Sequence, residues 1–149
     1  MLRSAFTMIE LIFVIVILGI LAAVAIPKLA ATRDDAEVSA IMTKIGQAVG
    51  EISNYAVSQG KVETDFSVMS NAIDNLVMRG EATLGNKSAA IKGGSVANCV
   101  SIQVVTNGLD ESMQILFGAP GGDDKCAAIQ NNLPLQNETI ALVGNRVSY

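Results

Sequence analysis

The 149-residue sequence contains no histidine and no tryptophan, and aromatic residues make up only 4% of it. Without histidine, Ser-His-Asp and Cys-His catalysis, histidine metal sites and the simplest pH switch near neutrality are excluded. Two cysteines are too few for a four-thiolate zinc site. No glycine-rich loop leads into a helix to hold a phosphate. These absences argue against most enzymes, and we predict a protein without catalytic activity or a resident cofactor.

Charge is scarce as well. Only 16% of the residues are charged, the net charge is -4, and half of the residues are hydrophobic. Such apolar content excludes a disordered polyampholyte. The acidic balance provides no overall attraction to nucleic acid or anionic lipid. The length suits one domain with an appendage.

The apolar residues are concentrated near the N-terminus. Residues 11–26 contain no charged or strongly polar side chain, and the run extends back to Phe6 with Glu10 as its only charge. As a helix it would be about 31 Å long, roughly the thickness of the hydrocarbon core of a bilayer. Arg3 precedes the run and favours a cytoplasmic N-terminus. We therefore expect one span of the inner membrane, with most of the chain on the outer side.

A secretory signal peptide is the alternative interpretation of this segment. Ala23-Val24-Ala25 matches an A-x-A cleavage pattern after a basic start and an apolar run. Three features argue against a signal peptide: the basic start is very short, a carboxylate lies inside the apolar run, and the helical pattern continues past Ala25.

Glu10 distinguishes these interpretations. A carboxylate costs about 2–3 kcal/mol at the centre of a membrane and less near its surface, so it normally has a partner or a function. No Lys or Arg lies between residues 4 and 27. Cleavage after Ala5 would place the new α-amine of Phe6 one helical turn away, where it could pair within the chain or with Glu10 of an axially shifted neighbour. The simpler alternative is that Glu10 reaches the head groups without a specific role.

Residues 4–11, SAFTMIEL, resemble the processing site of type IV pilins and of the pseudopilins of type II secretion. That family has a short basic leader, a small residue before the cut, a Phe that opens the mature chain, then Thr, Glu and an apolar helix. The resemblance covers roughly residues 3–32. Ala5 departs from this pattern, because leaders of the family usually end in Gly. Since Ala is also small, we expect the peptidase to cleave the leader all the same.

The resemblance implies a leader at 1–5, a membrane and fibre-core segment at 6–27 and a globular head at 28–149. It implies that prepilin peptidase cleaves between Ala5 and Phe6 and N-methylates Phe6. The residues implied in assembly are Phe6, Thr7 and Glu10, with Glu10 setting the subunit register.

Gly19 and Pro27 fall where the family carries Gly and Pro, and the helix between these positions often unwinds in its fibres. Pro27 also predicts a kink by itself, because it removes one helical hydrogen bond and clashes with the preceding turn. A simple end to the membrane span is the alternative.

Three functions fit the resemblance. The first is a self-assembling pilus for adhesion, motility or DNA uptake, with nucleic acid as a partner only in the last case. The second is a pseudopilus that drives protein export, and the third is an anchored or secreted periplasmic binding module that does not assemble. Assembly implies further partners: membrane lipid, the peptidase, an inner-membrane platform and an assembly ATPase. The sequence leaves major and minor subunits undistinguished.

Beyond Pro27, apolar residues at spacings of three and four predict that the helix continues to about Gln59. Its apolar stripe comprises Leu29, Ile41, Ile45, Val49, Ile52 and Ala56. A shorter helix is predicted at 66–79, capped by Asp65, followed by a loop at 80–95.

The remaining chain predicts an antiparallel sheet of three or four strands packed on the long helix, an α+β head similar to that of pilins. Alternation predicts a strand at 100–104, and Asn107-Gly108 predicts a turn to a strand at 113–117. A helical turn is expected at 124–132. A second hairpin is predicted from 139–143 to 146–149, around Gly144-Asn145.

Cys99 and Cys126 predict a disulfide, because the head is expected outside the cytoplasm; two free thiols are the alternative. Asp123 and Asp124 are weak calcium candidates, since that ion takes about six to eight oxygen ligands and a solvated loop explains two acids equally well. Lys87 and Lys92 form a sparse basic pair that could touch DNA or simply aid solubility.

Overall fold

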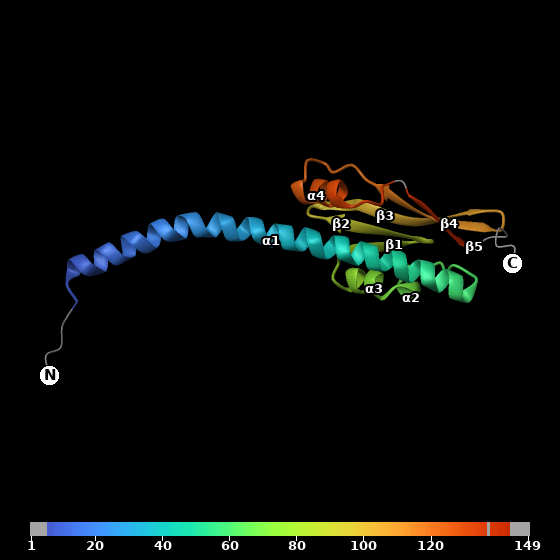
Figure 1. Cartoon of the computed structure of the whole chain (residues 1–149), viewed down its shortest axis with the longest axis horizontal. Helices are drawn as coiled ribbons and strands as arrows, with labels where there is room; N and C mark the ends of the chain where they lie inside the picture. Colours follow the sequence, from blue (N-terminus) through green and yellow to red (C-terminus); the bar gives the residue numbers. More distant parts are fainter. Residues whose placement is uncertain (1–5, 137, 144–149) are drawn as a thin grey trace, which may run out of the picture. The chain divides into compact units, whose positions relative to one another are not determined.

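The computed structural model describes residues 6–136 and 138–143. Its elements are α1 (Met8–Gln59), α2 (Phe66–Met69), α3 (Asn71–Met78), β1 (Ala82–Gly85), β2 (Ser88–Gly93), β3 (Val96–Asn107), β4 (Asp110–Phe117), α4 (Asp124–Asn132) and β5 (Thr139–Val143) (Figure 1). The chain forms two compact units, of which the first ends at Ala36 and the second begins at Glu37. The predicted α+β class, a long N-terminal helix with a small antiparallel sheet, is confirmed.

Helix α1 is unbroken over 52 residues and passes through Pro27 without interruption. In the second unit one side of the helix is buried, at spacings of mostly three and four residues. These residues are Val38, Ile41, Ile45, Ala48, Val49, Ile52 and Ala56. Leu29, which the predicted stripe included, is 68% exposed. The helix ends at Gln59, and the next residue, Gly60, has a positive φ of 66°, which suits the left-handed conformation that commonly follows a helix.

The five strands follow one another in sequence order, each antiparallel to the next. Ile91 stands opposite Val100, and Ile102 stands opposite Ile115, so apolar side chains meet across three neighbouring strands. They join the buried side of α1 and residues of α2 and α3 in one core. Figure 1 shows the second half of α1 along one face of this sheet and α4 over the other.

Two predicted elements were wrong. The segment 80–95 is not a loop, because it contains β1 and β2; its small residues form strands through pairing with β3, and Ala89 is fully buried there. The helix predicted at 66–79 is divided at Ser70, whose extended backbone ends α2 and whose hydroxyl accepts the N–H of Ile73 to begin α3. The sheet therefore has five strands, not three or four.

Strand β5 matches the predicted 139–143, whereas the second arm of that hairpin, 146–149, lies outside the described residues.

Cys99 of β3 and Cys126 of α4 are joined in the expected disulfide, and both are fully buried. The Gln130 side-chain amide donates to the carbonyl oxygens of Cys99 and Gly118, each at 2.8 Å. Helix α4 is thereby linked to β3 and to the residue after β4 by the disulfide and two hydrogen bonds.

Replacing both cysteines with serine should lower the free energy of unfolding by about 3 kcal/mol, because the crosslink no longer restricts the unfolded chain. Thermal unfolding of the full chain in detergent, followed by circular dichroism, measures this effect. The unmodified chain under reducing agent is the control and should show a similar loss. An unchanged midpoint in both samples would contradict the stabilising role.

Candidate functional site

The N-terminus of α1 is formed by a reciprocal pair of side chains. The Thr7 backbone N–H and hydroxyl donate to Oε2 of Glu10 at 2.9 and 2.7 Å, and the Glu10 N–H donates to Thr7 Oγ1 at 3.3 Å. This arrangement is a capping box, with a threonine at the cap and a glutamate three residues later. It satisfies amide groups that the first turn of a helix cannot pair by itself. The helix accordingly begins at Met8.

The sequence itself contains the signal for this contact, because Thr-x-x-Glu ahead of an apolar run is the signature of a capping box. The expected partner of Glu10 was a cation, whereas its donors in the structure are the amide and the hydroxyl of Thr7. Glu10 therefore has local partners, and both hydrogen bonds to its carboxylate end on the same oxygen, Oε2.

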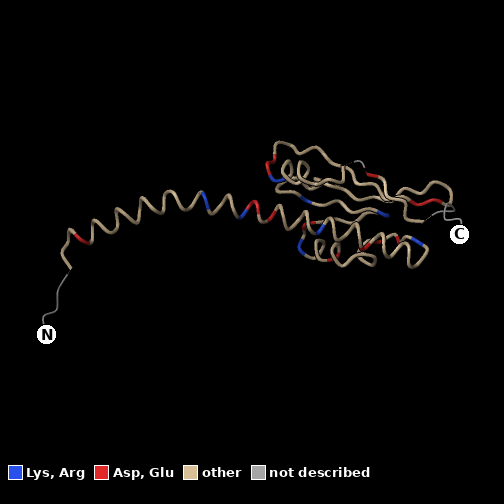
Figure 2. Tube along the Cα trace, in the orientation of Figure 1, with Lys and Arg blue, Asp and Glu red and all other residues tan. Residues whose placement is uncertain are grey.

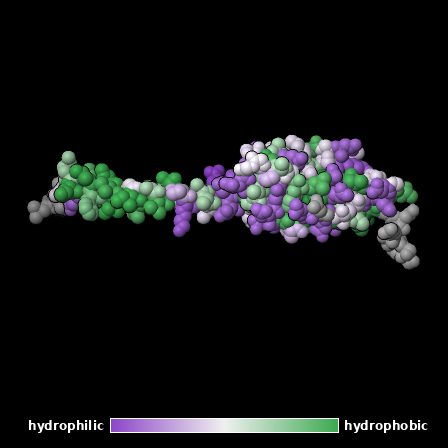
Figure 3. Space-filling view, turned by 90° about the horizontal axis from the view of Figure 1, so that it is seen from above, coloured by the Kyte–Doolittle hydropathy of each residue, from purple (hydrophilic) through white to green (hydrophobic). Residues whose placement is uncertain are grey.

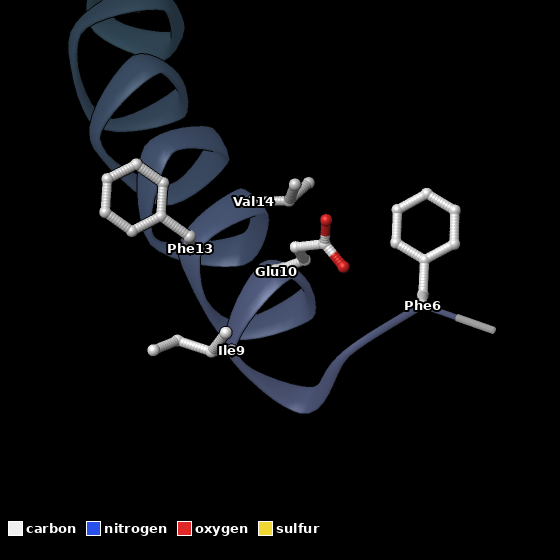
Figure 4. Close-up of a pocket in the computed structure, with 5 residues that line it drawn as sticks. All are labelled: Phe6, Ile9, Glu10, Phe13 and Val14. Atoms are coloured by element: carbon white, nitrogen blue, oxygen red, sulfur yellow. The ribbon is translucent and has the colours of Figure 1, made fainter. Parts of the chain in front are cut away.

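A shallow hollow surrounds this carboxylate. It is lined by Phe6, Ile9, Glu10, Phe13 and Val14 (Figure 4). The carboxylate points toward the side on which Phe6 lies, whereas Phe13 and Ile9 lie on the other side. The Phe6 side chain is 84% exposed. The structure thus places Phe6, Thr7 and Glu10 together at one helix end, while Ala5 lies outside the described residues.

The apolar part of α1 that follows is exposed within the chain. Phe6 and the large apolar residues of the helix up to Leu29 are 44–84% exposed. No charged residue lies between Glu10 and Lys28 in the sequence, and Figure 2 accordingly shows a long uncharged stretch near the start of the helix. Figure 3 shows a mostly hydrophobic surface along this part of the helix. A Cβ at Gly19 would meet nothing within 4 Å. Soluble monomers rarely expose an apolar patch of this extent, and such patches mark contacts with lipid or with another protein. Helix α1 is long and apolar enough to cross a membrane.

Asp123, one of the two calcium candidates, is occupied by donors of the protein itself. Its Oδ1 accepts the N–H groups of Lys125 and Cys126, which caps α4, and its Oδ2 accepts the N–H and hydroxyl of Ser95 at 2.8 and 2.7 Å. These bonds, those from Ser95 above all, lower the pKa of Asp123 from 3.8 to about 2. Asp123 thus links the turn between β2 and β3 to α4.

The remaining candidates do not gather into one site. Asp124 is exposed, and within the described residues no group of three potential ligands is placed to hold a metal ion. Lys87 forms an ion pair with Glu111 and donates to Thr106 Oγ1 at 3.4 Å, so its charge is partly neutralised. Lys92 is exposed on β2.

No family model, no curated protein and no solved structure matches this chain. Functional interpretation therefore depends on the geometry of the chain itself.

Asp123 should make stability depend on pH in acid. Because its pKa is lowered on folding, its contribution is present above about pH 4 and is lost as the pH falls toward 2. We expect Asp123→Asn to reduce the fall in the thermal midpoint over this range and to lower the midpoint at neutral pH. The adjacent, exposed Asp124→Asn is the control and should keep the wild-type profile. Identical profiles for all three proteins would contradict this role of Asp123.

Proposed function

We propose that this chain is a structural subunit of a type IV pilus-like fibre, processed between Ala5 and Phe6 and assembled through its N-terminal helix. The observation that carries the proposal is an exposed apolar half-helix whose only charge, Glu10, is held at its end beside Phe6. A helix used only as a lipid anchor could be capped equally well by glutamine, without the cost of a charge in an apolar surrounding. A helix that must meet identical helices at one axial position gains from the charge itself.

The two compact units are consistent with a subunit that is first held in the membrane and later assembled into a fibre. Before assembly, lipid covers the apolar residues of the first unit, and the second unit folds around its own core. After extraction, the apolar helices of many copies cover one another, since close helix packing can replace lipid contacts. The heads then form the fibre surface, on the periplasmic side or outside the cell.

In this proposal, pairing of opposite charges sets the axial position of each subunit relative to its neighbour. After cleavage, the α-amine of Phe6 is a cation at the same depth as Glu10. The carboxylate keeps one oxygen outside the capping box, and this oxygen can accept the amine of a neighbouring copy. Two opposite charges in an apolar surrounding attract strongly, which favours one axial position of the neighbour. The chain itself acts without catalysis, so a peptidase, a membrane platform and an assembly ATPase provide processing and energy.

The first expected outcome concerns the N-terminus. Intact mass and N-terminal peptide analysis of the protein from its native membrane should show a chain that begins at N-methylated Phe6. A chain that begins at Ile26 would identify a secreted protein and remove the fibre proposal. An intact Met1 would identify an unprocessed anchor.

The second expected outcome separates the two roles of Glu10. Glu10→Ala should preserve membrane insertion and cleavage but abolish most fibre formation. Glu10→Gln keeps the capping box, because glutamine serves at this position, but removes the charge. We expect Glu10→Gln to impair assembly nearly as strongly, as measured by sheared fibres relative to total subunit. Normal assembly of Glu10→Gln would show that capping alone is the function of this residue.

A further inference from the structure

The turn between β3 and β4 contains the only Asn-Gly pair of the sequence. Asn107 is the last residue of β3, and Gly108 and Leu109 connect it to β4. Both residues of the pair are exposed. Within the described residues the Asn107 side chain has no hydrogen-bond partner, and neither has the Gly108 N–H. A free carboxamide therefore lies next to a free backbone amide.

This arrangement leaves the two groups able to react with each other. Asparagine is a chemically labile residue, because the nitrogen of the next residue can attack its side-chain carbonyl carbon. Glycine has no Cβ to shield that nitrogen. At Gly108, where φ is 68°, even an added Cβ would meet nothing within 4 Å, so no packing restrains the turn. Asn107 and Asp110 are the last pair of the ladder, and end pairs open most readily.

The turn between β1 and β2 provides an internal comparison. Asn86 is likewise exposed at the tip of a hairpin. The residue after it is Lys87, whose backbone N–H donates to the Thr64 carbonyl at 2.9 Å. That amide is held by a hydrogen bond and shielded by a side chain. Two asparagines in similar turns thus differ in the availability of the neighbouring amide.

We propose that Asn107 is a site of spontaneous deamidation. The Gly108 nitrogen forms a bond to Cγ of Asn107, and the side-chain nitrogen leaves as ammonia with the proton of the Gly108 amide. This step gives a succinimide ring without any change of oxidation state. Water then opens the ring at either carbonyl, which yields aspartate or isoaspartate. The modification requires only water, and it does not depend on the fibre proposal.

The product places one negative charge opposite another. Asn107 stands directly across from Asp110 in the ladder. Neighbouring residues of a strand point to opposite faces, so the ion pair between Lys87 and Glu111 lies on the other face of the sheet. Like charges directly opposite each other destabilise a strand pair. Isoaspartate also adds a carbon atom to the main chain of β3. Deamidation should therefore loosen the turn end of this hairpin.

Ageing of the full chain in detergent tests the site. The protein is incubated at mildly alkaline pH in water enriched in heavy oxygen, which labels only the amides lost during incubation. Fragmentation spectra of the digested chain then compare Asn107 with Asn86. We expect Asn107 to lose its amide first and to yield both labelled aspartate and labelled isoaspartate, while Asn86 keeps its amide. Loss at Asn107 no faster than at Asn86, or labelled aspartate without isoaspartate, would overturn the proposal.

Two variants separate the reaction from its consequence. Asn107→Gln keeps the carboxamide but requires a larger ring, so the amide at this position should persist. Asn107→Asp introduces the product charge directly. Hydrogen exchange at the amides of 106–111 should become about two- to fivefold faster, as expected for one like-charged cross-strand pair. Asn54→Asp, which adds the same charge at an exposed position of α1, is the control and should leave this exchange unchanged. Wild-type exchange in Asn107→Asp would overturn the loosening of the hairpin.

Discussion

One constraint underlies the rest of this structure: a single unbroken helix carries two apolar surfaces, and the chain covers only one of them. From Val38 to Ala56 the buried side of α1 forms the centre of the head. From Phe6 to Leu29 large apolar side chains remain exposed. Burial of apolar surface is the main favourable term in folding and in association, so the uncovered half is the surface on which the proposed membrane and fibre contacts depend. The covered half determines the fold.

A carboxylate accepts hydrogen bonds at the start of each of the four helices that the structure describes. Glu10 caps α1 through Thr7, Asp65 caps α2, and Asp123 caps α4 while it accepts two bonds from Ser95. Glu51, near the C-terminal end of α1, accepts the Ser70 hydroxyl and the Ala72 N–H at the start of α3. These bonds lower the pKa of Glu51. Acidic residues that the sequence suggests as metal ligands or as solvent-exposed charges thus act as hydrogen-bond acceptors at the starts of helices.

Several charged side chains of the head form ion pairs within the head itself. Glu37, Glu81 and Lys87 have partners within the head. These ion pairs therefore act within one subunit.

The sequence by itself determined the long helix, its division into an apolar and an amphipathic half, the β3–β4 hairpin and the disulfide partners, because periodicity, turn residues and cysteine number are local signals. It also contained the capping box of Thr7 and Glu10. Tertiary structure alone decided that the small residues of 82–93 form two strands, since pairing with β3 outweighs their weak strand preference. It likewise decided that Asp123 binds Ser95, 28 residues away, because no local pattern specifies which distant donors a carboxylate will meet.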